Sequence, residues 1–246
     1  MPDRSAGICV WPKPSRCWPL AAALLLPSAW AGGVGGSLGA TSDYVFRGIS
    51  LSDHQPAGQG DVHYRADAGW FVGLAAASVK RGRGQDVTAE LNPYLGFAWA
   101  LDSDWSARLA YVHYAYPFNA PHRLYDYDEL GGTLAWRDRA FLTVAASPDT
   151  GVETTRGTAA GRAALAYNLG VHQPLPGAFS VNAGVGYYDL RWAIGTGYVY
   201  WNAGFGYDRG RLHLDASYIG TNAVARRLYY DELAVNRWVV SLLWHF

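Results

Sequence analysis

Polar and apolar residues alternate along most of this chain with the period of two that is typical of β-strands. In the clearest segment, 59–68, the odd positions from Gln59 to Asp67 are polar and the even positions are small or apolar. The same alternation recurs at 87–99, 199–207 and 238–246. Because successive side chains of a strand point to opposite faces, each segment has one apolar and one polar face.

Twelve such segments are predicted along the chain, at 36–47, 58–68, 70–80, 86–100, 105–116, 126–136, 139–148, 156–169, 178–190, 197–208, 210–220 and 234–246. Short connections at 69, 102–104, 137–138 and 209–210 alternate with longer ones at 48–57, 81–85, 117–125, 149–155, 191–196 and 221–233. The connection 170–177 is an exception, because it is long where a short turn is expected.

Antiparallel strands with short turns at one end and longer loops at the other are typical of outer-membrane barrels. The segment lengths suit the roughly 9–11 tilted residues that cross the hydrocarbon layer. We therefore predict an all-β fold, a transmembrane antiparallel β-barrel of about 12 strands with both chain ends on the periplasmic side. The competing fold is a soluble β-sandwich, which would carry more charge and needs no apolar outward face.

Composition supports the membrane barrel. Only 16% of the 246 residues are charged, against about 25% in soluble domains. The formal net charge of zero gives no electrostatic basis for a nucleic-acid partner. The sequence also contains no run of 18 apolar residues, so no membrane-spanning helix is predicted.

The N-terminal segment has the features of a secretory signal peptide. Basic residues between positions 4 and 16 precede the apolar stretch 17–26, and Ala29-Trp30-Ala31 matches a cleavage site. We expect residues 1–31 to be the signal peptide and residues 32–246 to form the barrel. Both cysteines, Cys9 and Cys17, lie in the predicted signal peptide.

The C-terminal segment alternates and ends on an aromatic residue, with Trp244 and Phe246 on its apolar face. This pattern resembles the signal that the outer-membrane barrel assembly machinery recognises. We therefore expect that machinery to be a partner during biogenesis and the cell outer membrane to be the location.

Basic residues cluster in two predicted loops, at 80–83 and at Arg226-Arg227. Arginine suits the phosphates of lipopolysaccharide, so outer-membrane lipid and lipopolysaccharide are candidate partners. Ordinary solvated loop charge explains the same clusters equally well.

The first part of the predicted barrel carries a family resemblance. The segment Ser42-Asp43-Tyr44-Val45-Phe46-Arg47-Gly48-Ile49-Ser50 is followed by Pro56-Ala57, by Gly69-Trp70-Phe71-Val72-Gly73 and by 76–78. It resembles the TorF-like family of proposed porins from proteobacteria, also called the Gcw_chp family. The resemblance implies an outer-membrane barrel with a proposed porin role, and it implies no catalytic residues.

Charged residues in the strand segments are expected to face the barrel interior, because Arg or Lys in the hydrocarbon midplane costs about 2–4 kcal/mol. The candidates for lining the lumen are Asp43, Arg47, Asp61, His63, Arg65, Asp67, Glu90, Arg162, Arg211, His213, Asp215 and Arg237. We expect antiparallel pairing of the first two strands to bring Arg47 to Asp61 and Asp43 to Arg65.

A lumen lined in this way predicts a narrow passive channel for small polar solutes or ions. The alternative is a barrel plugged by paired charges, with a structural or surface-binding role. About 8 strands fill their own interior and about 16–18 leave a clear pore, so strand number leaves both readings open.

A hydrolase at the barrel rim is the third reading, and Ser52-Asp53-His54 in the first long loop is its best candidate. The sequence contains no Gly-x-Ser-x-Gly elbow and no His-Glu-x-x-His metal motif. We therefore predict no catalytic, cofactor-binding or metal-binding residue, no cofactor and no enzymatic activity.

Two stretches of the chain share a Tyr-Asp-Glu-Leu core, at 127–130 and 230–233. They lie close to the starts of the sixth and twelfth predicted strands. A duplicated half-barrel would explain this, and so would a limited set of residues at the membrane rim.

Overall fold

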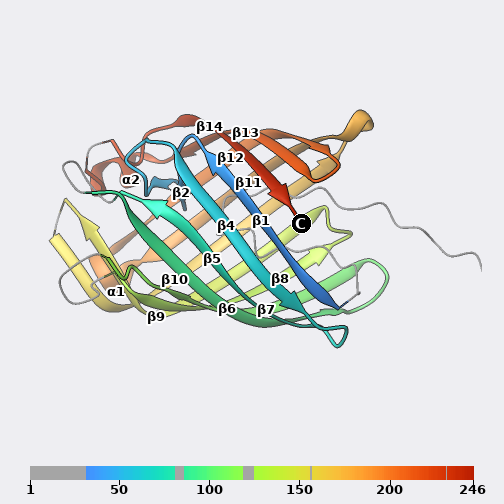
Figure 1. Cartoon of the computed structure of the whole chain (residues 1–246). Coiled ribbons are helices and arrows are strands. Elements are labelled where there is room, and N and C mark those ends of the chain that lie inside the picture. The colour runs from blue at the N-terminus through green and yellow to red at the C-terminus, as the bar shows by residue number, and fades with distance from the viewer. Residues whose placement is uncertain (1–31, 81–85, 119–124, 156, 231) are drawn as a thin grey trace, which may run out of the picture.

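The computed structural model describes residues 32–80, 86–118, 125–155, 157–230 and 232–246. Twelve antiparallel strands close into one barrel, and a separate two-stranded sheet lies in the connection after the first strand (Figure 1). The predicted all-β antiparallel barrel is confirmed. The signal peptide expected at 1–31 lies outside the described residues.

The barrel wall consists of β1 (Gly33–Thr41), β4 (Ala57–Arg65), β5 (Trp70–Val79), β6 (Thr88–Ala100), β7 (Trp105–Tyr114), β8 (Tyr127–Trp136), β9 (Ala140–Thr154), β10 (Gly157–Pro174), β11 (Phe179–Leu190), β12 (Thr196–Arg209), β13 (Leu212–Thr221) and β14 (Arg237–His245). The small sheet is β2 (Val45–Phe46) with β3 (Ile49–Ser50). Short helices are η1 (Pro176–Ala178), α1 (Arg191–Ile194) and α2 (Ala223–Leu228). In the described part of the chain, no helix has the length and apolar character to cross a membrane.

The barrel closes where β1 pairs with β14, in a register that runs from Ser37 opposite His245 to Thr41 opposite Ser241 (Figure 1). Phe246 extends this seam, because its N–H donates to the Gly36 carbonyl at 3.0 Å and its carbonyl accepts from the Gly36 N–H at 3.1 Å. Every wall strand therefore has a partner on both sides, as a hydrocarbon surrounding requires.

The outer surface of the barrel is apolar. Along β4, Val62 and Tyr64 point outward, while Asp61 and His63 lie half-buried on the inner face. Exposed aliphatic side chains continue this surface around the wall, among them Val34, Leu38, Leu74, Leu95, Leu109, Leu142, Leu169, Val185, Leu214 and Val240. Exposed Trp70, Trp105, Trp136 and Trp244 lie near the strand ends, where aromatic side chains suit a membrane interface.

The connections predicted at 149–155 and 170–177 are mostly strand in the structure. Strands β9 and β10 are 15 and 18 residues long, and β9 continues to Thr154. Likewise β10 continues to Pro174, and η1 occupies most of the short link to β11. The pairing of β9 with β10 shifts register between Ala159 and Ala164, which marks a bulge near the turn that joins the two strands.

The short-turn end of the barrel carries an exposed ion pair between neighbouring turns. Nε and Nη2 of Arg137 each lie 2.9 Å from a carboxylate oxygen of Asp104. The hydrogen bond from Arg137 favours the ionised form of Asp104 and lowers the pKa of that carboxyl group. Because both side chains are well exposed, water screens this pair and it contributes little to stability.

Removal of Phe246 should impair assembly, because it removes two backbone hydrogen bonds and an aromatic side chain at the seam. We expect less heat-modifiable, folded protein in the membrane fraction and more degraded or aggregated chain. Phe179→Ala is the matched control, since both phenylalanine residues are 51% exposed and Phe179 lies away from the seam. Normal membrane levels of the truncated chain would contradict a role for this residue.

Candidate functional site: a loop inside the barrel

The connection between β1 and β4, residues 42–56, turns into the barrel instead of projecting from it (Figure 1). We call it the inserted loop. Tyr44, Val45 and Ile49 are at most 5% exposed. The strands β2 and β3 pair Val45 with Ser50 and Phe46 with Ile49, which leaves Arg47 and Gly48 as a two-residue turn at the tip.

The tip is a tight hairpin turn that contacts the barrel wall. Arg47 has a φ of 49° and Gly48 a φ of 82°, and two positive φ values are the mark of a type I′ turn. A Cβ atom on Gly48 would lie 2.4 Å from Thr221 Cγ2 and 2.9 Å from Tyr200 Cβ. Only glycine therefore fits between the turn and strands β12 and β13.

Arg47 forms a buried ion pair across the lumen. Its Nη2 lies 2.5 Å from Glu129 Oε2 on β8, and the two side chains are 6% and 10% exposed. The guanidinium carbon also lies 4.6 Å from the ring centre of Phe46 and 4.4 Å from that of Tyr188. The expected pairing of Arg47 with Asp61 was wrong, because Arg47 belongs to the inserted loop and not to the first strand.

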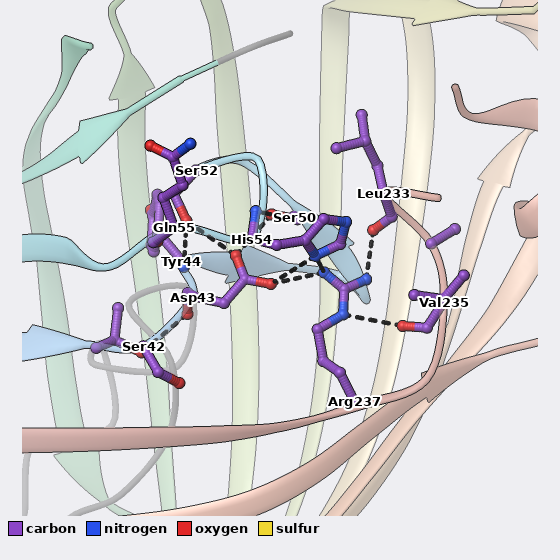
Figure 2. Close-up of polar contacts among 12 residues, drawn as sticks. Ser42, Asp43, Tyr44, Ser50, Ser52, His54, Gln55, Leu233, Val235 and Arg237 are labelled. Atoms are coloured by element: carbon purple, nitrogen blue, oxygen red, sulfur yellow. Dashed lines mark hydrogen bonds and ion pairs between the residues drawn. The ribbon is translucent and has the colours of Figure 1, made fainter. Parts of the chain in front are cut away.

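Asp43 is the centre of a second anchor, at the base of the inserted loop (Figure 2). Arg237 Nη1 on β14 donates to Asp43 Oδ2 at 2.6 Å, and Ser50 and Ser52 donate to Oδ1 at 2.6 and 2.9 Å. Arg237 also donates to the carbonyl oxygens of Leu233 and Val235. The expected pairing of Asp43 with Arg65 was wrong for the same reason.

A third anchor joins the inserted loop to β6. The Tyr44 hydroxyl donates to Glu90 Oε1 at 2.9 Å, and Asn92 donates to the same oxygen at 2.6 Å. The Tyr116 hydroxyl donates to Glu90 Oε2 at 2.6 Å. Glu90 is only 1% exposed, so these donors compensate the burial of its carboxylate. Three different wall strands thus hold the loop.

The wall candidates on β4 and β13 lie on the inner face. Asp61 accepts from Tyr94 at 2.6 Å and its other oxygen lies 2.6 Å from His63 Nδ1. His213 is buried with Nδ1 2.7 Å from Asp208, and Asp215 accepts from Ser217 at 2.7 Å. Arg65, at the end of β4, is half-buried.

Three candidates do not line the enclosed lumen. Asp67 is exposed in the turn after β4, where it accepts from the Gly32 N–H. Arg162 is exposed on the β9–β10 hairpin, next to the register shift. Arg211 is exposed in the turn between β12 and β13. Alternation predicts an inward direction for all three, but a bulge at Arg162 and turns at Asp67 and Arg211 interrupt the period of two.

Glu129 and Arg108 are inner-face residues that our selection from the sequence omitted. Arg108 on β7 lies with its guanidinium carbon 4.1 Å from the Phe71 ring centre, and its three buried nitrogen atoms have no hydrogen-bond partner among the described residues. Arg108 and Glu129 each precede a leucine that points outward, Leu109 or Leu130. The period of two therefore predicts that both charged residues point inward.

The hydrolase candidate Ser52-Asp53-His54 does not form a nucleophile and base pair. The Ser52 hydroxyl lies 2.9 Å from Asp43 Oδ1 and 2.6 Å from the Gln55 carbonyl oxygen. Asp53 pairs with Lys80 at 3.4 Å, and His54 Nδ1 lies 2.9 Å from Arg237 Nη1 (Figure 2). These contacts build the anchor of the loop rather than a proton relay.

Two cavities flank the inserted loop. A small one of about 30 Å³ lies against Asp43 and is lined by polar wall residues that include Asn202, Asp215 and Ser241. A larger one of about 240 Å³ lies on the other side, between the hairpin and the long loops. Within the described ranges, no group of three His, Cys, Asp or Glu side chains could hold a metal ion.

Comparison with solved structures shows a porin-like barrel fold. The KdgM porin is similar with a TM-score of 0.51 at 10% identity, over 87% of this chain and 99% of that chain. The NanC porin is similar with a TM-score of 0.55 at 9% identity, over 86% of this chain and 98% of that chain. At these identities the similarity shows the fold alone. No curated protein sequence matches the chain.

The sequence comparison extends the resemblance found in the first third of the barrel. The model of the Gcw_chp family, described as a bacterial protein of unknown function, matches residues 30–246. The narrower TorF-like assignment stays a prediction. Since the match covers the whole barrel, the chain belongs to the Gcw_chp family.

Proposed function

We propose that this protein is a porin-like passive channel of the outer membrane for small polar solutes or ions, with the inserted loop as its constriction. The observation that carries the proposal is the position of the loop, which lies inside the barrel and is held by Glu90, Glu129 and Arg237 of the wall. The apolar outer surface and the porin-like fold support the membrane setting.

The Arg47–Glu129 pair is the contact that fixes the tip of the constriction. Loss of one partner of a buried ion pair costs about 3–5 kcal/mol, because the other charge stays buried without compensation. Glu129 is in that position, since its side chain is only 10% exposed. Removal of Arg47 would therefore favour states in which the tip leaves Glu129 and water reaches that carboxylate.

The alternative function is a plugged barrel with a structural or surface-binding role. The observation that favours it is the number of anchors, because three separate wall strands hold the same loop. Channel and plug differ in whether ions pass beside the loop, which conductance measures directly.

Arg47→Ala should raise the single-channel conductance of the refolded protein in planar bilayers by about twofold or more, because it frees the tip and removes a positive charge from the constriction. The cation preference should rise as well. Arg137→Ala is the control, since it removes an arginine from an exposed pair outside the lumen and should leave conductance unchanged.

If neither the unmodified protein nor Arg47→Ala conducts ions in planar bilayers, although both barrels are folded and heat-modifiable, the channel proposal is contradicted. A marked fall in unfolding temperature for Arg47→Ala without any current would identify the loop as a structural plug.

The orientation proposed here places the long connections outside the cell and the short turns in the periplasm. The barrel assembly machinery, outer-membrane lipid and lipopolysaccharide are proposed partners. For lipopolysaccharide, Arg226 and Arg227 offer exposed side chains on α2, whereas Arg81 to Arg83 lie outside the described residues.

Single cysteines should report this orientation, because the chain has only Cys9 and Cys17, both in the expected signal peptide. A membrane-impermeant maleimide should label Ala223→Cys, at the exposed start of α2, on intact cells. Ser103→Cys, in an exposed short turn, should be labelled only after the outer membrane is opened. The opposite result would invert the barrel.

A further inference from the structure

The larger cavity beside the inserted loop is unusually rich in tyrosine. It measures about 240 Å³ and is lined by seven tyrosines, together with Phe46 and Ile49 of the hairpin. We call it the tyrosine vestibule. The lining includes residues on both sides of the long connections, so the vestibule lies at the end of the barrel that we assign to the cell exterior.

Three contacts between rings of the vestibule are edge-on, whereas the lining residue Tyr127 stacks on Tyr114 at 4.4 Å and 10°. Tyr198 meets Tyr188 at a centroid distance of 5.9 Å and an angle of 82°, and meets Tyr229 at 5.7 Å and 81°. Tyr116 and Tyr125 meet at 6.2 Å and 75°. Rings held at steep angles form walls that face in several directions, and the negative faces of such rings attract cations.

The charges around the vestibule are mostly negative. Among the described residues that line it, Glu153 is the one carboxylic acid and no basic residue is present. Behind the lining lie the carboxylates of Glu90 and Glu129, against the single guanidinium of Arg47. That guanidinium already lies over the Tyr188 ring, which shows that a ring of this set accepts a cation.

Several hydroxyl groups of the lining already have partners. Tyr116 donates to Glu90 at 2.6 Å, Tyr125 donates to Glu153, and the Tyr188 hydroxyl lies 3.1 Å from Thr150 Oγ1. A sugar would bring many hydroxyl groups that each need a partner, and an unpaired buried polar group is unfavourable. A cation without N–H or O–H groups at its charged centre makes no such demand.

We propose that the tyrosine vestibule binds a quaternary ammonium group, either on a free solute or on a lipid headgroup. This inference adds a ligand class to the proposed channel. It rests on that proposed function for the side of the membrane from which the ligand arrives. Aromatic rings supply cation–π attraction, and Glu153 supplies a carboxylate at the edge of the cavity.

The test is calorimetric titration of the whole protein in a non-ionic detergent. The probes are choline and 3,3-dimethylbutan-1-ol, which has the same shape without the charge. Choline should bind at least about tenfold more tightly, because desolvated cation–π contacts favour the charged probe. Glycerophosphocholine binding as tightly as choline would identify a lipid headgroup as the source, and much weaker binding would identify a free solute.

Three variants examine the role of the rings and of the carboxylate. Tyr230→Leu should weaken choline binding severalfold, whereas Tyr230→Phe should retain it, because the ring and not the hydroxyl binds the cation. Glu153→Gln should also weaken it. Tyr64→Leu is the matched control, because Tyr64 is 50% exposed on the outer wall and Tyr230 is 49% exposed at the vestibule.

Equal affinity for choline and its neutral analogue would overturn the proposal, as would binding of neither probe by folded protein. Loss of binding in Tyr230→Phe would also overturn it, since that result assigns recognition to the hydroxyl. Binding does not require conduction, so a silent barrel that binds choline contradicts only the channel. A conducting barrel that does not bind choline contradicts only the vestibule.

Discussion

The backbone of a membrane barrel must satisfy its own hydrogen bonds, and the rest of this structure follows from that constraint. Hydrocarbon offers no partner for an open sheet edge, so β1 must close on β14. In a closed barrel the outer face of each strand meets hydrocarbon, so apolar side chains are favoured on that face and charged side chains on the inner face. The interior then has to compensate those charges, which the wall does only in part.

The inserted loop supplies the missing partners. Arg47 compensates Glu129, Asp43 compensates Arg237, and Tyr44 donates to Glu90. These wall residues lie on β8, β14 and β6, so the loop connects parts of the barrel that have no direct strand pairing. The same contacts that stabilise the interior also narrow it, which is why stability and permeation are linked in the proposed function.

Much of the wall could be predicted from the sequence because alternation is a local property. The predicted segments 105–116 and 178–190 correspond closely to Trp105–Tyr114 and Phe179–Leu190. The predicted first strand includes residues 42–47, because their alternation continues past Thr41. In the structure Asp43 and Tyr44 are both buried inside the barrel, a situation that local periodicity cannot separate from a membrane strand.

The partners within the candidate site could not be predicted in this way. Alternation gives the direction of Glu90 and Asp61 but not what they meet across the lumen. The shared Tyr-Asp-Glu-Leu core illustrates the difference. Glu129 of the first copy lies in β8 and pairs with Arg47, whereas Glu232 of the second lies before β14, exposed and with a φ of 62°. The first copy therefore opens β8, whereas the second copy precedes β14.

The anchors of the inserted loop also impose an order in time on the formation of the barrel. The loop follows the first wall strand in the chain, yet Tyr44, Arg47 and Asp43 bond to residues 46, 82 and 194 positions later. The last of these partners, Arg237, begins the final strand. The loop can therefore complete its contacts only when the last strand has arrived, so an early segment of the chain is among the last to reach its final place.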